Sequence, residues 1–214
     1  MIRYSIAKSM TRRSVRPHAI GAGFFIGVVA FVCGLALSAV TMIGWRLTAP
    51  HDLWIGDWTA GSITSIDMYA WTFYSAHFVG ISWEEGLIFG ENFRILAHSP
   101  IGHSNFLFYL IPLVVLVVGG FAISYLTLSA KASITQYAVR GTTIAIGYGV
   151  TAIVGTAIFH GQTTNLYREG IYVMRPDLGY TILLIGFLYP IALGGIGGLF
   201  AKAVVESGAI RLTG

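Results

Sequence analysis

Histidine and acidic residues are the side chains of this sequence best suited to metal binding or acid–base chemistry. Imidazole nitrogens and carboxylate oxygens are common ligands of zinc and other divalent metals. The residues concerned are His51, His77, His98, His103, His160, Glu84, Glu85 and Glu91. The nearest pair, His98 and His103, is five residues apart, which is not a recognised ligand spacing. We therefore predict no metal site and interpret these histidines as solvated or hydrogen-bonded residues.

Motifs for covalent or phosphoryl chemistry are also missing from the sequence. It contains no nucleophile elbow, no phosphate-binding loop and no HExxH. The glycine-rich run 194–198 lies inside an apolar segment, where a phosphate could not be solvated. Glu84 and Glu85 are adjacent, so in a strand they would point to opposite faces and make a poor catalytic pair. We predict no catalytic residue and no cofactor.

Four charge-free runs dominate the rest of the chain, at residues 17–45, 95–130, 141–167 and 178–201. Each is long enough to cross the ~30 Å hydrocarbon layer as a helix of ~20 residues. Only 10% of residues are charged and 55% are hydrophobic, against about 25% charged residues in a soluble domain. The pattern predicts an all-α integral membrane protein, a bundle of four transmembrane helices.

The predicted organisation alternates spans with short connections, except for one longer segment. The boundaries are a tail 1–18, a span 19–45, a cap 46–100, a span 103–128, a loop 129–140, a span 141–160, a loop 161–177, a span 178–201 and a tail 202–214. The first apolar run exceeds the 7 to 15 residues of a secretory signal, which favours a retained anchor. A fifth span at 59–83 would place Asp67 and His77 near hydrocarbon, which is costly, so we expect four.

Charge distribution predicts the orientation, because lysine and arginine are retained in short cytoplasmic loops. The two tails and the loop 129–140 together carry nine basic residues and one acidic residue. The cap and the loop 161–177 carry four basic and eight acidic residues. We therefore expect both termini in the cytoplasm of a cell-membrane protein. The basic N-terminal tail is expected to attract anionic lipid rather than nucleic acid.

The segment 46–100 is rich in aromatic residues, which a disordered loop would not be. From Tyr69 to Trp83, bulky residues alternate with small ones, the period-two pattern of a strand. We predict a small extracytoplasmic cap of short strands. An aromatic surface there suits either the membrane interface or the docking of a partner. The residues assigned to docking are Trp54, Trp58, Trp71, Tyr74 and Trp83.

The run Ala70–Val79, with the sequence AWTFYSAHFV, follows the first predicted span and precedes three more. In this motif and layout the chain resembles uncharacterised multi-pass membrane proteins of haloarchaea. The resemblance implies an archaeal membrane protein with four helices. It implies no activity for any particular residue.

Small residues recur at four-residue spacing within the predicted spans, where they let helix backbones approach closely. The residues assigned to helix packing are Gly23, Gly27, Gly34, Gly141, Gly149, Gly186, Pro190, Gly194 and Gly198. Such stripes serve packing within one chain, association between chains, or both. Proline within a helix removes a hydrogen bond, so we expect a bend at Pro190.

These features favour a non-catalytic membrane subunit that packs through its glycine-rich faces and its aromatic cap into a homo-oligomeric or hetero-oligomeric assembly. Its expected partners are membrane lipid and either other membrane subunits or further copies of itself. The first alternative is a small channel or carrier for an ion or small solute. The lack of charged residues in the centre of the spans argues against ion-coupled transport. A membrane enzyme acting at the outer interface is the third hypothesis.

Overall fold

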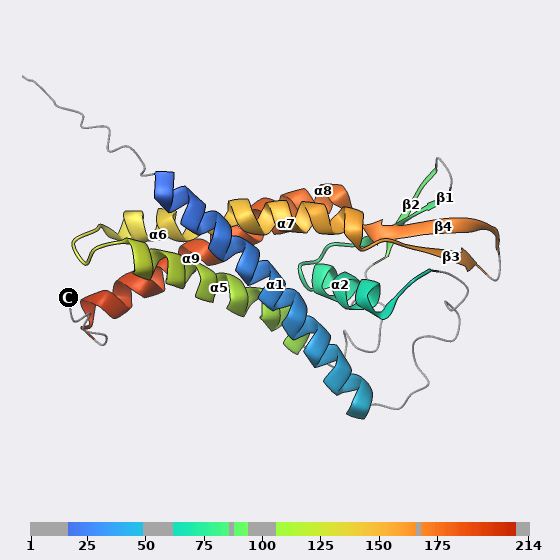
Figure 1. The fold of residues 1–214 in the computed structure, drawn as a ribbon, viewed down its shortest axis with the longest axis horizontal. Coiled ribbons are helices and arrows are strands. Elements are labelled where there is room, and N and C mark those ends of the chain that lie inside the picture. The colour runs from blue at the N-terminus through green and yellow to red at the C-terminus, as the bar shows by residue number, and fades with distance from the viewer. Residues whose placement is uncertain (1–16, 49–61, 86–87, 94–105, 166–167, 209–214) are drawn as a thin grey trace, which may run out of the picture.

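The computed structural model describes residues 17–48, 62–85, 88–93, 106–165 and 168–208. The helices are α1 (Pro17–Thr48), α2 (Ser65–Ala76), α5 (Leu107–Thr127), α6 (Ile134–Thr142), α7 (Ile144–Ile158), α8 (Leu178–Tyr180), the π-helix η1 (Thr181–Leu188) and α9 (Tyr189–Glu206). The strands are β1 (Ile81–Glu85), β2 (Ile88–Phe93), β3 (Gly161–Asn165) and β4 (Arg168–Pro176). The molecule is elongated, with the helices at one end and the strands at the other (Figure 1).

Within the described residues, four helical segments are long and apolar enough to cross a membrane, which agrees with the predicted number and fits a multi-pass membrane protein. They are Ile20–Gly44, Leu107–Thr127, Ile134–Ile158 and Leu178–Glu206, with lengths of 25, 21, 25 and 29 residues. The third begins at Ile134 rather than at residue 141, because Ser133 and Gln136 cap α6. The Ser133 hydroxyl accepts a hydrogen bond from the Gln136 N–H, and the Gln136 side chain accepts one from the Ser133 N–H.

The outward faces of these helices carry large apolar side chains that the rest of the chain leaves uncovered. Phe25 on α1, Val118 on α5 and Leu183 in η1 are each more than half exposed. Water would penalise such a surface, since each buried methylene is worth about 0.8 kcal/mol. Such a surface fits a bilayer, whose acyl chains would cover it.

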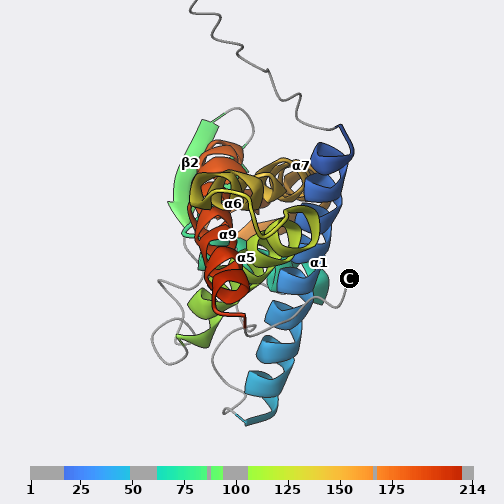
Figure 2. The ribbon, with the colours of Figure 1, turned by 90° about the vertical axis from the view of Figure 1, so that its left-hand side faces the viewer.

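The main contacts among the long helices are made by α9 and by α1. The helix α9 packs against α5 and α6, and α1 packs against α7 and α5. Viewed along the helices, α1 lies on one side of the group, beside α7 and α5 (Figure 2). Only Thr143 separates α6 from α7, so the two form one span with a short interruption.

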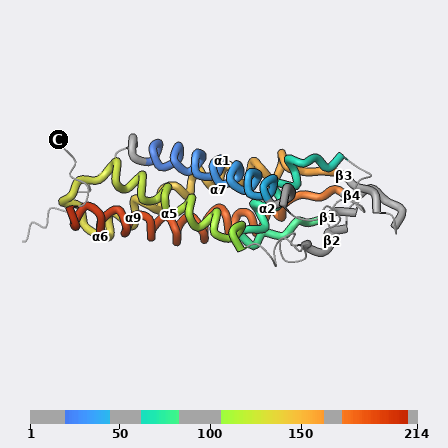
Figure 3. Tube along the Cα trace, turned by 90° about the horizontal axis from the view of Figure 1, so that it is seen from below, coloured from blue at the N-terminus to red at the C-terminus, as the bar shows by residue number. Residues whose placement is uncertain are grey.

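A four-stranded antiparallel sheet lies beyond one end of the helices, with strand order β2-β1-β4-β3. Its central pairing joins β1, which follows the first span, to β4, which precedes the fourth, and Trp83 pairs with Met174. The tube view shows the sheet and α2 at the same end (Figure 3). The segment 161–177, predicted as a loop, therefore supplies half of the sheet. We call this end of the molecule the sheet end.

The prediction of a strand beginning at Tyr69 is wrong, since residues 65–76 form the helix α2. Thr64 and Asp67 form a capping box at its start, which favours a helix locally. Nearly all side chains from Ala70 to Ala76 are buried. An alternation of large and small residues cannot distinguish strand from helix when every face is buried. With 12 residues, α2 is about 18 Å long, too short to cross a bilayer.

Glycines at the helix contacts generate a prediction for α9, where Gly198 and Gly195 provide a matched pair. A Cβ at Gly198 would collide with the backbone carbonyl of Tyr137, whereas a Cβ at Gly195 would meet Thr142 Cγ2 at 3.5 Å and the Ala138 carbonyl at 3.9 Å, both ordinary contacts. We expect Gly198→Ala to destabilise the protein by about 1–3 kcal/mol through overpacking. Gly195→Ala should be neutral or slightly stabilising, because alanine favours helix. Thermal unfolding of both variants in mild detergent measures the difference, and equal midpoints would contradict it.

Candidate functional site

The buried polar side chains of the helical part gather where α2 meets α7 and the start of α9. We call this group the α2 cluster: Trp71, Tyr74, His77, Tyr148 and Tyr189. The first three come from α2 and its C-cap, Tyr148 from α7 and Tyr189 from the start of α9. Trp71, Tyr74, His77 and Tyr148 are each at most 1% exposed.

Local hydrogen bonds at both ends of α2 position these side chains. At its start, the Asp67 carboxylate accepts hydrogen bonds from the Thr64 N–H at 2.8 Å and the Thr64 hydroxyl at 2.6 Å. At its end, Phe78 adopts a left-handed conformation with φ 62°, which terminates the helix. The Phe78 ring stacks on Tyr109 of α5, with centroids 5.4 Å apart. A non-glycine residue in this conformation costs of order 1–3 kcal/mol, so its surroundings must hold it there.

Three side chains of the α2 cluster bind the third span or its end. The Trp71 indole donates a hydrogen bond to the Phe159 carbonyl at 2.9 Å. The Tyr74 hydroxyl donates to the Ala152 carbonyl at 2.5 Å. His77 Nε2 lies 2.8 Å from the Tyr148 hydroxyl. These bonds attach α2 to α7 along most of the length of α7. Each of them satisfies a polar group that would be costly to bury without a partner.

The hydrogen bonds of His77 define its tautomer. Nδ1 lies 2.9 Å from the Phe73 carbonyl, which can only accept, so Nδ1 carries the proton. Nε2 is then an acceptor, and the Tyr148 hydroxyl donates to it. Both ring nitrogens are occupied. His77 could therefore ligate a metal only by losing one of these bonds.

Burial determines the protonation state of the cluster. Desolvation lowers the pKa of His77 to about 4, although its hydrogen bond to the Phe73 carbonyl acts in the opposite direction. Desolvation also raises the pKa of the Tyr74 hydroxyl above its ordinary value. At neutral pH both side chains are uncharged. They can exchange hydrogen bonds, but they supply neither a nucleophile nor a fixed charge.

The π-helix η1 lies next to this cluster. Tyr189 is the residue directly after η1. The centroid of its ring lies 5.3 Å from that of the His77 ring, in an edge-on arrangement. Pro190, buried at the start of α9, lacks an N–H and cannot continue the hydrogen-bond pattern of the helix. π-helical turns are rare and are frequent at functional sites. The irregular part of the fourth span thus coincides with its contact to His77.

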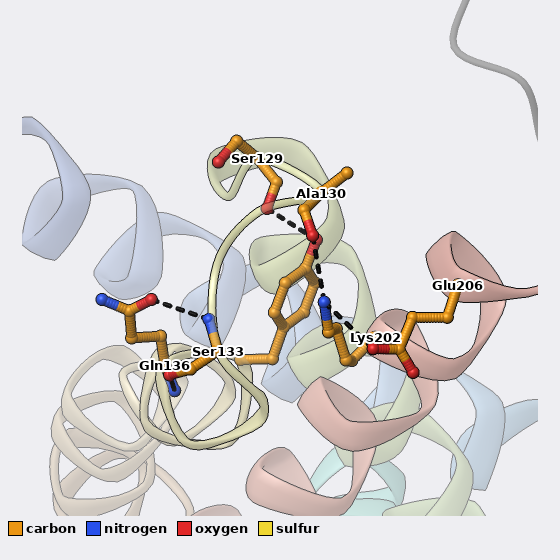
Figure 4. A network of polar contacts seen from close by, with 7 residues as sticks. Ser129, Ala130, Ser133, Gln136, Lys202 and Glu206 are labelled. Carbon is orange, nitrogen blue, oxygen red and sulfur yellow. Dashed lines mark hydrogen bonds and ion pairs between the residues drawn. The ribbon is translucent and has the colours of Figure 1, made fainter.

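A second polar group lies at the opposite end of the helices, around Lys202. The Lys202 ammonium group donates a hydrogen bond to the Ala130 carbonyl at 3.0 Å and pairs with Glu206 at 3.2 Å. It also lies 5.5 Å from the centroid of the Tyr137 ring. Figure 4 shows Lys202 reaching from α9 to the turn between α5 and α6. This residue connects the second, third and fourth spans.

The predicted packing glycines lie mostly at contacts between helices of the same chain. Gly23 meets Thr143, Gly27 meets Ile144 and Tyr148, Gly34 meets Phe73, Gly141 meets Gly194, Gly149 meets Gly186, and Gly198 meets Tyr137. At each of these contacts a Cβ would come closer than 3.0 Å to a neighbouring atom. Gly186 is different, because a Cβ there would have its nearest neighbour at 3.7 Å. Its partner Gly149 is the residue that must lack a side chain.

The residues predicted for docking have varied positions. Trp71 and Tyr74 are buried against α7, which corrects their assignment to an exposed surface. Trp83 lies in β1, opposite Met174. Trp54 and Trp58 lie outside the described residues, as do His51, His98 and His103. Within the described ranges, no three His, Cys, Asp or Glu side chains lie together as a metal site requires.

Sequence reasoning missed the buried position of His77 and the roles of Tyr148 and Lys202. One signal was available: Thr64-x-x-Asp67 ahead of an apolar run is the pattern of a capping box. It would have predicted α2 and brought His77 to the end of a helix. No local signal identifies Tyr148, because its partner is 71 residues away in the sequence.

A protein-family model described as a family of unknown function, DUF7978, matches residues 4–205 of the 214-residue chain. The match covers most of the chain, so the protein belongs to this family. No curated protein and no solved structure is detectably similar to it. The resemblance to haloarchaeal membrane proteins stays a prediction.

The burial of His77 predicts a pH dependence of stability. Because its folded-state pKa is about 4 and its unfolded value about 6.5, the unfolded chain binds a proton first as the pH falls. Stability should therefore decrease as the pH falls from about 6.5 to about 4, by roughly 3 kcal/mol. His77→Gln should remove this component of the pH dependence. Unfolding midpoints between pH 4 and 8 test it.

The control for this experiment is His160→Gln, since His160 is exposed and its Nδ1 contacts only the Ala157 carbonyl. The control should keep the pH profile of the unmodified protein. If His77→Gln also kept that profile, the buried neutral state of His77 would be refuted.

The Lys202 contacts predict unequal effects for the two partners of one ion pair. The side chain of Lys202 is 11% exposed, and that of Glu206 is 65% exposed. Lys202→Met keeps the apolar stem but removes the hydrogen bond to Ala130 and the contact of its charge with Tyr137, so we expect a loss of about 1–3 kcal/mol. Glu206→Gln should change stability by less than about 1 kcal/mol. Unfolding midpoints of the two variants measure this, and a larger effect at Glu206 would reverse the assignment.

Proposed function

We propose that this member of the DUF7978 family is a non-catalytic integral membrane subunit that acts by binding another membrane protein at its sheet end. The observation that carries the proposal is the sheet itself. Two segments far apart in the sequence, Ile81–Phe93 and Gly161–Pro176, combine into one antiparallel sheet. A sheet that is built from both segments at the end of the spans is suited to binding another protein.

The position of α2 supports this function. The bonds of Trp71, Tyr74 and His77 hold α2 against α7, and the Trp71 side chain also packs with Ile81 of β1 and Met174 of β4. The sheet end is thereby fixed to the spans rather than tethered by loops. A surface that is already ordered loses little conformational entropy on binding, which favours affinity.

The glycine contacts also support binding at the sheet end. In the structure the glycines Gly23, Gly27, Gly141 and Gly198 each contact another helix of the same chain. They are therefore used in folding and are not available as an intermolecular face. Association with other subunits, or with a second copy, would then use other surfaces, and the sheet end is one of them.

Charge favours an orientation with the sheet end outside the cytoplasm. Lys131, Arg140 and Lys202 lie near the end opposite the sheet, whereas Asp67 and Asp177 lie at the sheet end. Basic residues in short loops remain in the cytoplasm. We propose a cell-membrane protein with cytoplasmic termini and an extracytoplasmic cap made by α2 and the sheet over a four-helix bundle.

A small channel or carrier is the second candidate, and one observation favours it. His77 at the end of α2 and Tyr148 of the third span form a buried hydrogen bond, beside the π-helix η1. Uncharged polar groups can line a solute path, and irregular helices occur in transporters. Uptake of ions or small solutes by liposomes containing the purified protein would favour this candidate, provided that Tyr148→Phe reduced it.

Site-specific photocrosslinking tests the subunit proposal in native membranes. A photoreactive amino acid replaces Ile66, which is 64% exposed on α2, or Val118, which is 58% exposed on α5. The segment before α2 bonds to β3, because the Ser62 N–H donates to the Gln162 carbonyl at 2.8 Å, so Ile66 reports on the sheet end. We expect a discrete protein adduct at Ile66 and mainly lipid adducts at Val118. Protein adducts confined to Val118, or none at either position, would contradict the proposal.

A further inference from the structure

Arg140 lies on the side of the third span that faces α1. Thr143 and Gly147 follow it by one and two helical turns on the same stripe, and these two residues contact Gly23 and Phe24 of α1. The two helices run in the same direction along this contact. One turn before Thr143, Arg140 therefore lies level with the first turns of α1. The start of α1 and the helix α6 lie at the end of the molecule opposite the sheet (Figure 1).

One nitrogen of the Arg140 guanidinium group, Nη1, is buried without a hydrogen-bond partner among the described residues. A guanidinium group stays charged in proteins and has five N–H donors. Burying an unpaired charge is costly, and removing it from water next to lipid increases the cost. The position of Arg140 therefore favours an anionic partner.

The sequence offers no acidic side chain for this role. Residues 1–51 contain neither aspartate nor glutamate. Glu206, the one acidic residue beyond Asp177, already pairs with Lys202 at 3.2 Å. The eight others lie between the end of α1 and the start of α5, or between the end of α7 and the start of α8. Those of them that the structure describes lie in α2, in the sheet or at the start of α8, and α7 alone separates that end from Arg140 by about 22 Å.

The surroundings of Arg140 favour an anion that carries apolar chains. The first turn of α1 has N–H groups without intrahelical partners and the positive end of the helix dipole, and it contains no acidic residue. A cation beside that end is disfavoured, and an anion between them would stabilise both. Ile20 in the first turns of α1 and Val139, next to Arg140 in the sequence, are 45% and 60% exposed, which suits acyl chains.

We propose that Arg140 binds the phosphate group of an anionic phospholipid, held between α6 and the start of α1. The charge comes from the headgroup, and Ile20 and Val139 contact its acyl chains. Arginine suits this role because its planar donors match phosphate oxygens in pairs. The site requires no contact with the sheet end, so it stands independently of the proposed subunit function.

Lipid binding by the full-length protein tests this proposal. The protein is purified in mild detergent, depleted of lipid, and titrated with phosphatidylglycerol, phosphatidylcholine or inorganic phosphate. Binding is measured by native mass spectrometry and by the shift of the unfolding midpoint. The unmodified protein should bind phosphatidylglycerol in preference to phosphatidylcholine. Arg140→Gln should weaken phosphatidylglycerol binding roughly tenfold or more, and Arg140→Lys should weaken it less.

The matched control is Lys131→Gln, because Lys131 is an exposed cation in the turn between α5 and α6. It should bind phosphatidylglycerol like the unmodified protein. Equal losses at Lys131 and Arg140 would show a diffuse electrostatic effect and overturn the proposal. If inorganic phosphate shifted the unfolding midpoint as much as phosphatidylglycerol does, the ligand would be a soluble anion rather than a lipid, which would also overturn the proposal. Should Arg140→Gln fail to fold, an unmodified protein with no preference for phosphatidylglycerol would still refute it.

Discussion

Close contact between helix backbones at glycine residues is the constraint on which the rest of the structure depends. Lipid tails are as apolar as the side chains they would replace, so van der Waals contact largely drives helix association in a bilayer. Gly141 and Gly194 bring α6 and α9 together, and Gly27 brings α1 to the junction of α6 and α7. Side chains at these points would separate the helices. The contact of α2 with α7 would then lose its geometry.

The sequence predicts the features that depend on local composition. Long charge-free runs require membrane helices, and four were found where four were expected. Boundaries were less accurate, because α6 contains Arg140 and several polar residues and so did not resemble a span. A capping box and the cover given by other helices make this stretch helical despite its polarity. Local propensity decides where a helix begins, whereas tertiary contacts decide how far it extends.

Features that depend on contacts distant in sequence were not predictable in the same way. The sheet joins β1 to β4, and nothing within either segment specifies its partner. The buried pair of His77 and Tyr148 likewise requires the fold before the two side chains can meet. The alternation of large and small residues near Trp71 predicted a strand because a fully buried helix shows no polar face. The candidate site was therefore accessible from the structure and not from residue spacing.

The pairing of β1 with β4 also imposes an order on biogenesis. Ser82 of β1 pairs with Arg175 of β4, a residue 93 positions later in the chain. The β1–β2 hairpin is therefore synthesised before the two intervening spans and cannot pair with β4 until both have been made. Until β4 emerges on the same side of the bilayer, one edge of β1 remains open to other strands. Completion of the sheet thus requires that the second and third spans return the chain to the side on which β1 lies. A quality-control protease that recognises exposed strand edges would therefore distinguish correctly threaded chains from inverted ones.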